Sequence, residues 1–258
     1  MARNPNSQLS LFETAAQVPA PPADPMAQAR HKPKQPSYIG GHRKRLRQRF
    51  LVGGADPLPD YELLELILFR CLKNGDVKPL ANRLIAAFGN FNHVLSAPVE
   101  RLTEIEGVGP EIALDLKLIE AATHRMAQGT VLKRPVISSW NALLDYCRVT
   151  MSHRDTELFR VLFLDRKNVL IADEIQGIGT VDHVPVYPRE VIKRALDLNA
   201  SALILVHNHP SGDPTPSTAD IDMTEQIQGA CDSVGITVHD HLVIGRSTEV
   251  SFKSEGYL

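Results

Sequence analysis

An apolar run that ends in two histidines is the feature that most constrains the fold of this chain. It lies in the stretch "SALILVHNHPSGDPTPSTAD", Ser201 to Asp220. The unbroken apolar residues predict a strand that is buried on both faces. A loop rich in proline and glycine follows, and "STAD" is typical of a helix start. A buried strand joined in this way to a helix indicates an α/β domain.

Strands and helices alternate on both sides of this stretch. Strands are predicted in "LFRVLFLD", "NVLIADEIQ", "ITVHDHLVIG" and "VSFKSEG", with a hairpin turn at "DRKN" between the first two. Helices are predicted in "WNALLDYCRVTM", "PREVIKRALDLNA" and "STADIDMTEQIQGACDSVG". Because one connection is a hairpin and others are helices, we predict a mixed sheet, in an α/β domain that covers residues 136–258.

The earlier part of the chain has apolar residues at helical spacing. In "LPDYELLELILFRCL" they form one stripe, with Asp60 as the predicted N-cap, and "VKPLANRLIAAFGN" ends at Gly89. We therefore predict a small all-helical module over residues 41–130. Residues 1–40 are rich in proline and alanine, which predicts a disordered tail. Within the tail, "LSLFE" is either a segment without a specific role or a short docking peptide.

Cysteine usage and hydropathy exclude several classes of protein. The three cysteines are far apart and form no CxxC pair, which excludes a disulfide framework and a thiolate zinc finger. No apolar run approaches the roughly 18–20 residues that span a bilayer, and the N-terminus lacks the apolar block of a secretory signal. We therefore expect a cytoplasmic protein with no membrane partner.

The histidines at the end of the buried strand form a candidate metal site. His207 and His209 are two residues apart, so on a strand they project from the same face and reach one ion. Asp220 follows after a loop, at the start of a helix. Two imidazoles, a carboxylate and a water make an open tetrahedral zinc site. Ser217 and Asp220 also fit a capping box, so they are caps, site residues or both.

Neighbouring polar residues receive other interpretations. Asp213 is expected to form the turn between the strand and the helix. "HDH" puts His239 and His241 on one face of another predicted strand, but no loop and acid follow it. We therefore interpret Asp240 and His241 as residues that support the site or the fold rather than as ligands.

A zinc hydrolase also needs a base that takes a proton from water. Glu157, at the head of one predicted strand, and Glu174, late in the next, are both candidates. Periodicity does not choose between them.

The helical module has two features that point to nucleic acid. "HRKRLRQRF" carries Arg43, Lys44, Arg45 and Arg47 and is either a phosphate contact or a solvated helix face.

In addition, "LTEIEGVGPEIALDLKLI" resembles a helix-hairpin-helix, in which Gly107 and Gly109 allow a tight turn whose N–H groups face phosphate. Glu104, Glu106 and Glu111 crowd that turn and weaken the hypothesis.

The pattern His207-x-His209, Ser217, Asp220 matches the JAMM motif of JAB-domain metalloproteases. "VYPREVIKRAL", "ILVHNHPSGDPTPSTADIDMT" and "DHLVIG" are similar to the bacterial RadC-like JAB-domain proteins. The resemblance extends from about His42 to the C-terminus. It implies a JAB/MPN-type (cytidine deaminase-like) α/β domain with a mixed sheet, preceded by a helix-hairpin-helix module.

The resemblance also implies roles for single residues. His207, His209 and Asp220 would bind Zn²⁺, Glu157 would polarise the attacking water, and Ser217 would steady the oxyanion. The implied activity is that of a zinc metallopeptidase that hydrolyses an amide or isopeptide bond in a peptide or protein substrate. The alternative is a DNA-binding accessory protein of repair or recombination with a structural or vestigial metal site, or a metal-dependent nuclease. In either case the helical module could bind DNA without sequence preference.

Overall fold

The computed structural model describes residues 41–132, 134–179 and 184–258, so the predicted tail at residues 1–40 lies outside the described residues. Residues Gly41–Leu258 form one compact unit. In the described part of the chain, helices come first: α1 (His42–Gly53), α2 (Asp60–Cys71), α3 (Lys78–Phe88), α4 (Phe91–Ser96), α5 (Val99–Thr103) and α6 (Pro110–Val131). The predicted helical segment is therefore helical, and its last helix continues to Val131.

The helices enclose an apolar cluster of their own. Leu64 and Leu68 of α2, on the predicted stripe, are fully buried together with Leu84 of α3 and Leu116 of α6. Burial of these side chains, at roughly 1.5–3 kcal/mol each, holds the short helices together.

The prediction that Asp60 is an N-cap is wrong. The N-cap of α2 is Pro59, and Asp60 is the first residue of the helix. Its carboxylate Oδ2 accepts a hydrogen bond of 2.9 Å from the backbone N–H of Phe91. Asp60 therefore satisfies a free N–H at the start of α4, a helix that the sequence pattern did not predict.

The remaining elements form the α/β part of the chain. They are the 3₁₀ helix η1 (Val136–Ser139), α7 (Trp140–Met151), β1 (Leu158–Leu164), β2 (Leu170–Ile178), α8 (Pro188–Asp197), β3 (Ala202–Asn208), α9 (Thr218–Asp232), β4 (Thr237–Ile244), β5 (Glu249–Ser251) and α10 (Phe252–Glu255). The strands make one sheet in the order β2-β1-β3-β4-β5. The β3–β4 pair is parallel and the other pairs are antiparallel. The fold is thus a mixed-sheet α/β domain, as predicted, although "VSFKSEG" is a short strand followed by a helical turn.

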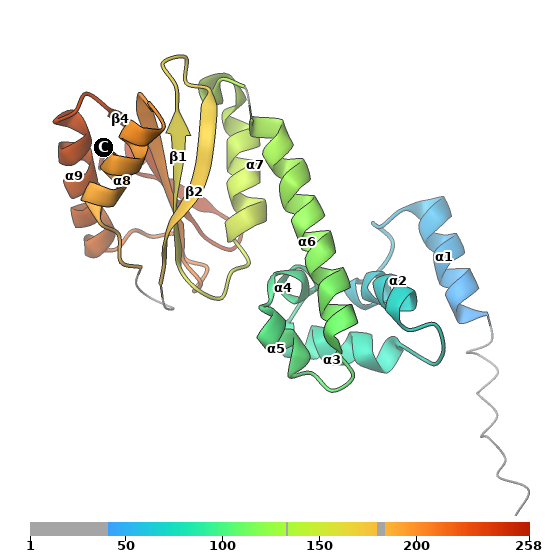
Figure 1. Ribbon diagram of the computed structural model, residues 1–258. Helices are drawn as coiled ribbons and strands as arrows, with labels where there is room; N and C mark the ends of the chain where they lie inside the picture. The colour runs from blue at the N-terminus through green and yellow to red at the C-terminus, as the bar shows by residue number, and fades with distance from the viewer. Residues whose placement is uncertain (1–40, 133, 180–183) are drawn as a thin grey trace, which may run out of the picture. The chain divides into compact units, whose positions relative to one another are not determined.

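Helices cover both faces of the sheet, with α7 on one side and α8 and α9 on the other (Figure 1). Side chains alternate between the two faces along each central strand. On β1, Leu162 packs with the α7 layer and Phe163 with the α8 and α9 layer. On β3, Ile204 and Leu205 divide in the same way, so His207, two residues after Leu205, faces the α9 side. None of the helices in the described residues is long and apolar enough to cross a membrane.

Candidate metal centre

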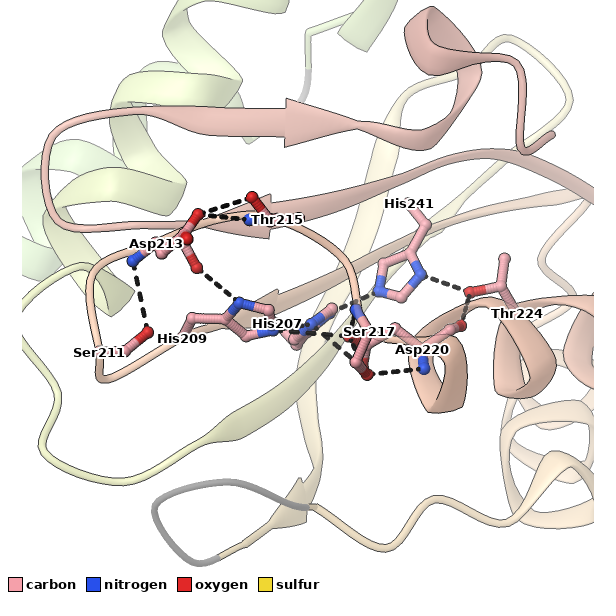
Figure 2. A network of polar contacts seen from close by, with 9 residues as sticks. All are labelled: His207, His209, Ser211, Asp213, Thr215, Ser217, Asp220, Thr224 and His241. Carbon is pink, nitrogen blue, oxygen red and sulfur yellow. Dashed lines mark hydrogen bonds and ion pairs between the residues drawn. The ribbon is translucent and has the colours of Figure 1, made fainter.

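Three candidate ligands meet between the end of β3 and the start of α9 (Figure 2). His207 Nε2 lies 3.0 Å from His209 Nε2 and 3.4 Å from Asp220 Oδ1. His209 Nε2 lies 3.5 Å from Asp220 Oδ2. His207 is fully buried inside the domain, whereas His209 is partly exposed. The structure therefore brings together the three residues that the sequence pattern selected.

These spacings suit a small tetrahedral ion. Ligand bonds of about 2.0–2.1 Å at tetrahedral angles put the donor atoms about 3.3 Å apart. The three separations among His207, His209 and Asp220 range from 3.0 to 3.5 Å. Among the described residues, this group of histidine, cysteine and acidic side chains is the one that could hold a metal ion.

A backbone carbonyl orients His209. Its Nδ1 lies 2.7 Å from the carbonyl oxygen of Asp213. A carbonyl can only accept, so Nδ1 carries the proton and a neutral His209 presents the Nε2 lone pair to the site. The Asp213 carboxylate accepts from the backbone N–H (3.0 Å) and hydroxyl (2.7 Å) of Thr215. Asp213 therefore forms the predicted turn and also aims a ligand.

Ser217 and Asp220 form the capping box that the sequence suggested. The Ser217 N–H and hydroxyl both donate to Asp220 Oδ2 at 2.7 Å, and the Asp220 N–H donates to Ser217 Oγ at 3.2 Å. The cap holds the carboxylate with Oδ1 toward His207. Because the Ser217 hydroxyl proton is used by Asp220, a role in steadying an oxyanion would require this hydroxyl to rotate.

The charges at the site favour a bound cation. Burial acts to raise the pKa of Asp220, but the adjacent imidazoles of His207 and His209 and the hydrogen bond from Ser217 outweigh it and hold this pKa well below its ordinary value. Burial lowers the pKa of His207, whereas the hydrogen bond to Asp220 raises the pKa of His209. An ionised carboxylate and a neutral imidazole are the forms that bind metal, and a metal would displace the proton from His209.

The structure separates the two candidate bases. Glu157 immediately precedes β1, is 5 % exposed, and lines a cavity of about 470 Å³ together with Ser217 and Asp220. Glu174, on β2, does not line this cavity. Its carboxylate accepts hydrogen bonds of 2.8 and 2.6 Å from Arg194 of α8, which lowers its pKa. Glu157 is therefore the candidate base that lies at the metal site.

The second histidine pair does not share a face. A register shift in the β3–β4 pairing lies between Leu203 and Ile204, opposite Val238 and Asp240. His239 Nε2 lies 2.6 Å from Asn168 Oδ1, in the turn between β1 and β2. His241 instead lies 2.7 Å from His207 and is fully buried. The expectation of one shared face is wrong because the irregularity breaks the alternation of the strand.

Asp240 holds the C-terminal elements in place. Its carboxylate accepts from the backbone N–H of His241 at 2.8 Å, the Ser251 hydroxyl at 2.6 Å and the Lys253 N–H at 3.1 Å. All three bonds are to β4, β5 and α10, so Asp240 supports the fold around His241.

The basic residues of α1 differ in how many contacts they make with the rest of the protein. Arg43 donates to the carbonyls of Leu72 (2.6 Å) and Gly75 (2.9 Å), and its guanidinium lies over the Phe69 ring at 4.5 Å. This guanidinium therefore holds the segment that follows α2. Arg47 also lies over the Phe69 ring, at 5.7 Å, but it is exposed, as are Lys44 and Arg45.

The predicted glycine turn connects α5 and α6. Gly107 has a φ of +94°, which favours glycine, and Gly109 is the N-cap of α6. Arg83 of α3 donates to the carbonyl of Glu106 at 2.9 Å. Sequence spacing missed this nearby cation because Arg83 reaches the turn from an earlier helix.

Comparison with known families covers most of the described chain. Residues 137–257 match the RadC-like JAB domain, and residues 41–114 match the UPF0758 N-terminal region. A UPF0758 protein of Ruegeria pomeroyi is 69 % identical over 223 residues, which are 86 % of this chain and 100 % of the relative. The chain belongs to the UPF0758 family of RadC-like proteins. A UPF0758 protein of Rhodobacter capsulatus is 68 % identical over 213 residues, 83 % of this chain and 100 % of that relative.

Within this UPF0758 chain, the RadC-like JAB domain match contains the whole candidate metal centre, from Glu157 to His241. The N-terminal match contains α1 to α5 and ends inside α6. The two matched regions thus divide the candidate metal centre from the glycine turn and the basic helix.

Proposed function

We propose that this protein is a zinc-dependent peptidase of the JAMM type, which hydrolyses an amide or isopeptide bond. The observation that carries the proposal is that Glu157 lines one cavity with Asp220, whose carboxylate meets His207 and His209 at ligand spacing. A metal site of three protein ligands with a carboxylate base beside it is the combination that metal-assisted hydrolysis requires.

Zinc bound by these ligands would supply a Lewis acid and lower the pKa of water to about 7. Glu157 would act as the general base. Its carboxylate takes a proton from the attacking water and delivers it to the leaving amine. Burial of Glu157 keeps this proton away from bulk solvent. Ser217, once its hydroxyl turns from Asp220, can donate to the oxygen on which negative charge develops.

The cavity beside the site suits an extended chain. One wall consists of residues 184–187, and the other is the first part of α9, with Ala219, Asp222, Met223 and Gln226. Valine, proline and tyrosine residues on one side and mixed apolar and polar side chains on the other would hold a peptide or the stem of a modified lysine. The proposed substrate is therefore a peptide or protein whose scissile bond reaches the metal centre along this groove.

The proposal is tested by comparing the zinc-loaded full chain with its Glu157→Gln variant on a cellular protein extract. Mass spectrometry would count new α-amino termini and newly freed lysine side chains. We expect new ends with the wild-type chain and none with the variant. If the two treated extracts have the same ends, the peptidase proposal fails.

DNA binding by the helical module is a second candidate function. It is favoured by the exposed Lys44, Arg45 and Arg47 and by Arg83 beside the Gly107 turn. We expect affinity for duplex DNA to fall steeply with salt, because each neutralised phosphate contributes about −0.9 to the slope of log K against log salt. Fluorescence anisotropy with labelled duplex measures this slope.

An Arg83→Ala variant should make the salt slope smaller by about one unit if this arginine contacts a phosphate. Arg148→Ala is the matched control, because Arg148 of α7 pairs with Glu249 of β5, outside the helical segment that carries the turn. A wild-type slope near zero would rule out the nucleic-acid role.

A further inference from the structure

Two polar side chains, those of His241 and Thr224, connect His207 with the backbone of Asp220 behind the site (Figure 2). His207 Nδ1 lies 2.7 Å from His241 Nε2, and His241 Nδ1 lies 2.6 Å from Thr224 Oγ1. Thr224 Oγ1 in turn donates to the backbone carbonyl of Asp220 at 2.5 Å. His207 and His241 are fully buried, and Thr224 is 1 % exposed. This series of hydrogen bonds therefore runs through buried groups from one candidate ligand to the backbone of another.

The available protons decide which group donates in each of these hydrogen bonds. A carbonyl oxygen only accepts, so the single hydroxyl proton of Thr224 is directed at Asp220. Thr224 must then accept from His241, and His241 Nδ1 carries the proton. Burial favours the neutral imidazole, so His241 Nε2 is a lone pair and accepts from His207 Nδ1. The proton of a neutral His207 is thereby placed on Nδ1, and its Nε2 lone pair faces His209 and Asp220.

We propose that His241 and Thr224 are positioning residues that select the metal-binding tautomer of His207. Ligand histidines usually donate their second N–H to a carboxylate or a carbonyl. Here the acceptor is a neutral imidazole, whose own direction is set by the hydroxyl of Thr224. This arrangement holds the ligand without a further buried carboxylate behind His207.

The three elements that meet here explain the rigidity of the arrangement. His207 comes from β3, His241 from the parallel neighbour β4, and Thr224 from α9, one helical turn after Asp220. The His241 ring packs against Phe159 and Phe252, with ring centroids 5.7 and 4.5 Å away. The ring therefore cannot turn freely, and the hydrogen bond to Thr224 decides which nitrogen faces His207.

The inference rests on the metal site of the proposed function but not on hydrolysis, and its first test needs no metal. In the metal-free full chain labelled with ¹⁵N-histidine, two-bond ¹H–¹⁵N correlations at neutral pH report the tautomer of each ring. We expect His207 and His241 to carry their protons on Nδ1. Protonation of His207 on Nε2 would overturn the proposal, whether or not the protein cleaves peptides.

The second test measures zinc affinity by competition with a chelator. Thr224→Val keeps the shape of the side chain but leaves His241 without its hydroxyl partner, so affinity should fall by about 10-fold or more. Thr224→Ser keeps the hydroxyl and should restore affinity. His241→Phe keeps a ring but removes the acceptor for His207, and the loss should lie within about 10- to 100-fold.

Thr150 offers a matched control for Thr224. It is also buried in a helix, is 4 % exposed, and donates to the carbonyl of Tyr146 at 2.9 Å, four residues earlier. Thr150→Val should therefore cost a similar amount of folding stability but leave zinc affinity unchanged. If Thr224→Val and Thr150→Val have equal zinc affinity, Thr224 is only structural and the proposal is wrong.

Discussion

Replacement of Glu157 by Gln is expected to lower kcat for hydrolysis by about 10²–10⁴-fold, the usual contribution of a general base. The amide has nearly the shape of the carboxylate but cannot accept a proton from water. Glu157 is not one of the three converging ligands, so the zinc content of the variant should equal that of the wild type. Steady-state kinetics on a substrate found in the protein extract and metal analysis of the same preparation measure the two quantities.

Glu174→Gln is the control for this prediction. Glu174 is the other strand glutamate that the sequence allows as a base, but its carboxylate is held by Arg194 away from the cavity. Its substitution should leave kcat unchanged. A large loss of kcat in Glu174→Gln with a normal rate in Glu157→Gln would contradict the assignment of the base.

The double variant His207→Ala, His209→Ala is expected to lose zinc completely, because Asp220 alone does not hold a Zn²⁺ ion at these positions. Free zinc at about 100 times the Kd should stabilise the wild-type protein by about 2.7 kcal/mol, since the ion binds only the folded chain. Zinc should not change the free energy of unfolding of the variant. Metal analysis measures the content, and chemical denaturation with and without zinc measures the free energy of unfolding.

His239→Ala tests whether this loss is specific to the site. His239 lies on β4, two residues before His241, but its ring binds Asn168 instead of facing the candidate ligands. The variant should keep one zinc per chain and the full stabilisation by zinc. An unchanged zinc content in the His207, His209 double variant would show that the ion binds elsewhere.

The sequence predicted the metal ligands well because their arrangement is local. His207 lies near the end of β3 and His209 one residue beyond it, and a short turn leads to the helix that carries Asp220. Strand alternation and helix capping both act over a few residues, so spacing alone indicated that these side chains meet. The same reasoning failed at His239 and His241, where a register shift between strands interrupts the alternation.

Other parts of the site depend on contacts between distant segments. Nothing in the spacing of Glu157 and Glu174 indicated that one lines the cavity and that the other pairs with Arg194 of α8. The partner of His207 was also hidden, because His241 reaches it only through the parallel pairing of β3 and β4. The sequence could have indicated Thr224, since a residue four positions after Asp220 on a helix lies on the same face.

The sequence by itself determined the α/β class, the helical segment before it and the three converging ligands, because hydrophobic periodicity and short spacings encode them. Periodicity left two glutamates open and the family resemblance favoured Glu157. Only the tertiary structure decided that Glu174 pairs with Arg194, which groups bind Arg43, and how His241 and Thr224 orient His207. The physical reason is that these contacts form when the sheet and its covering helices pack together. Their distances depend on the whole domain and not on neighbouring residues in the chain.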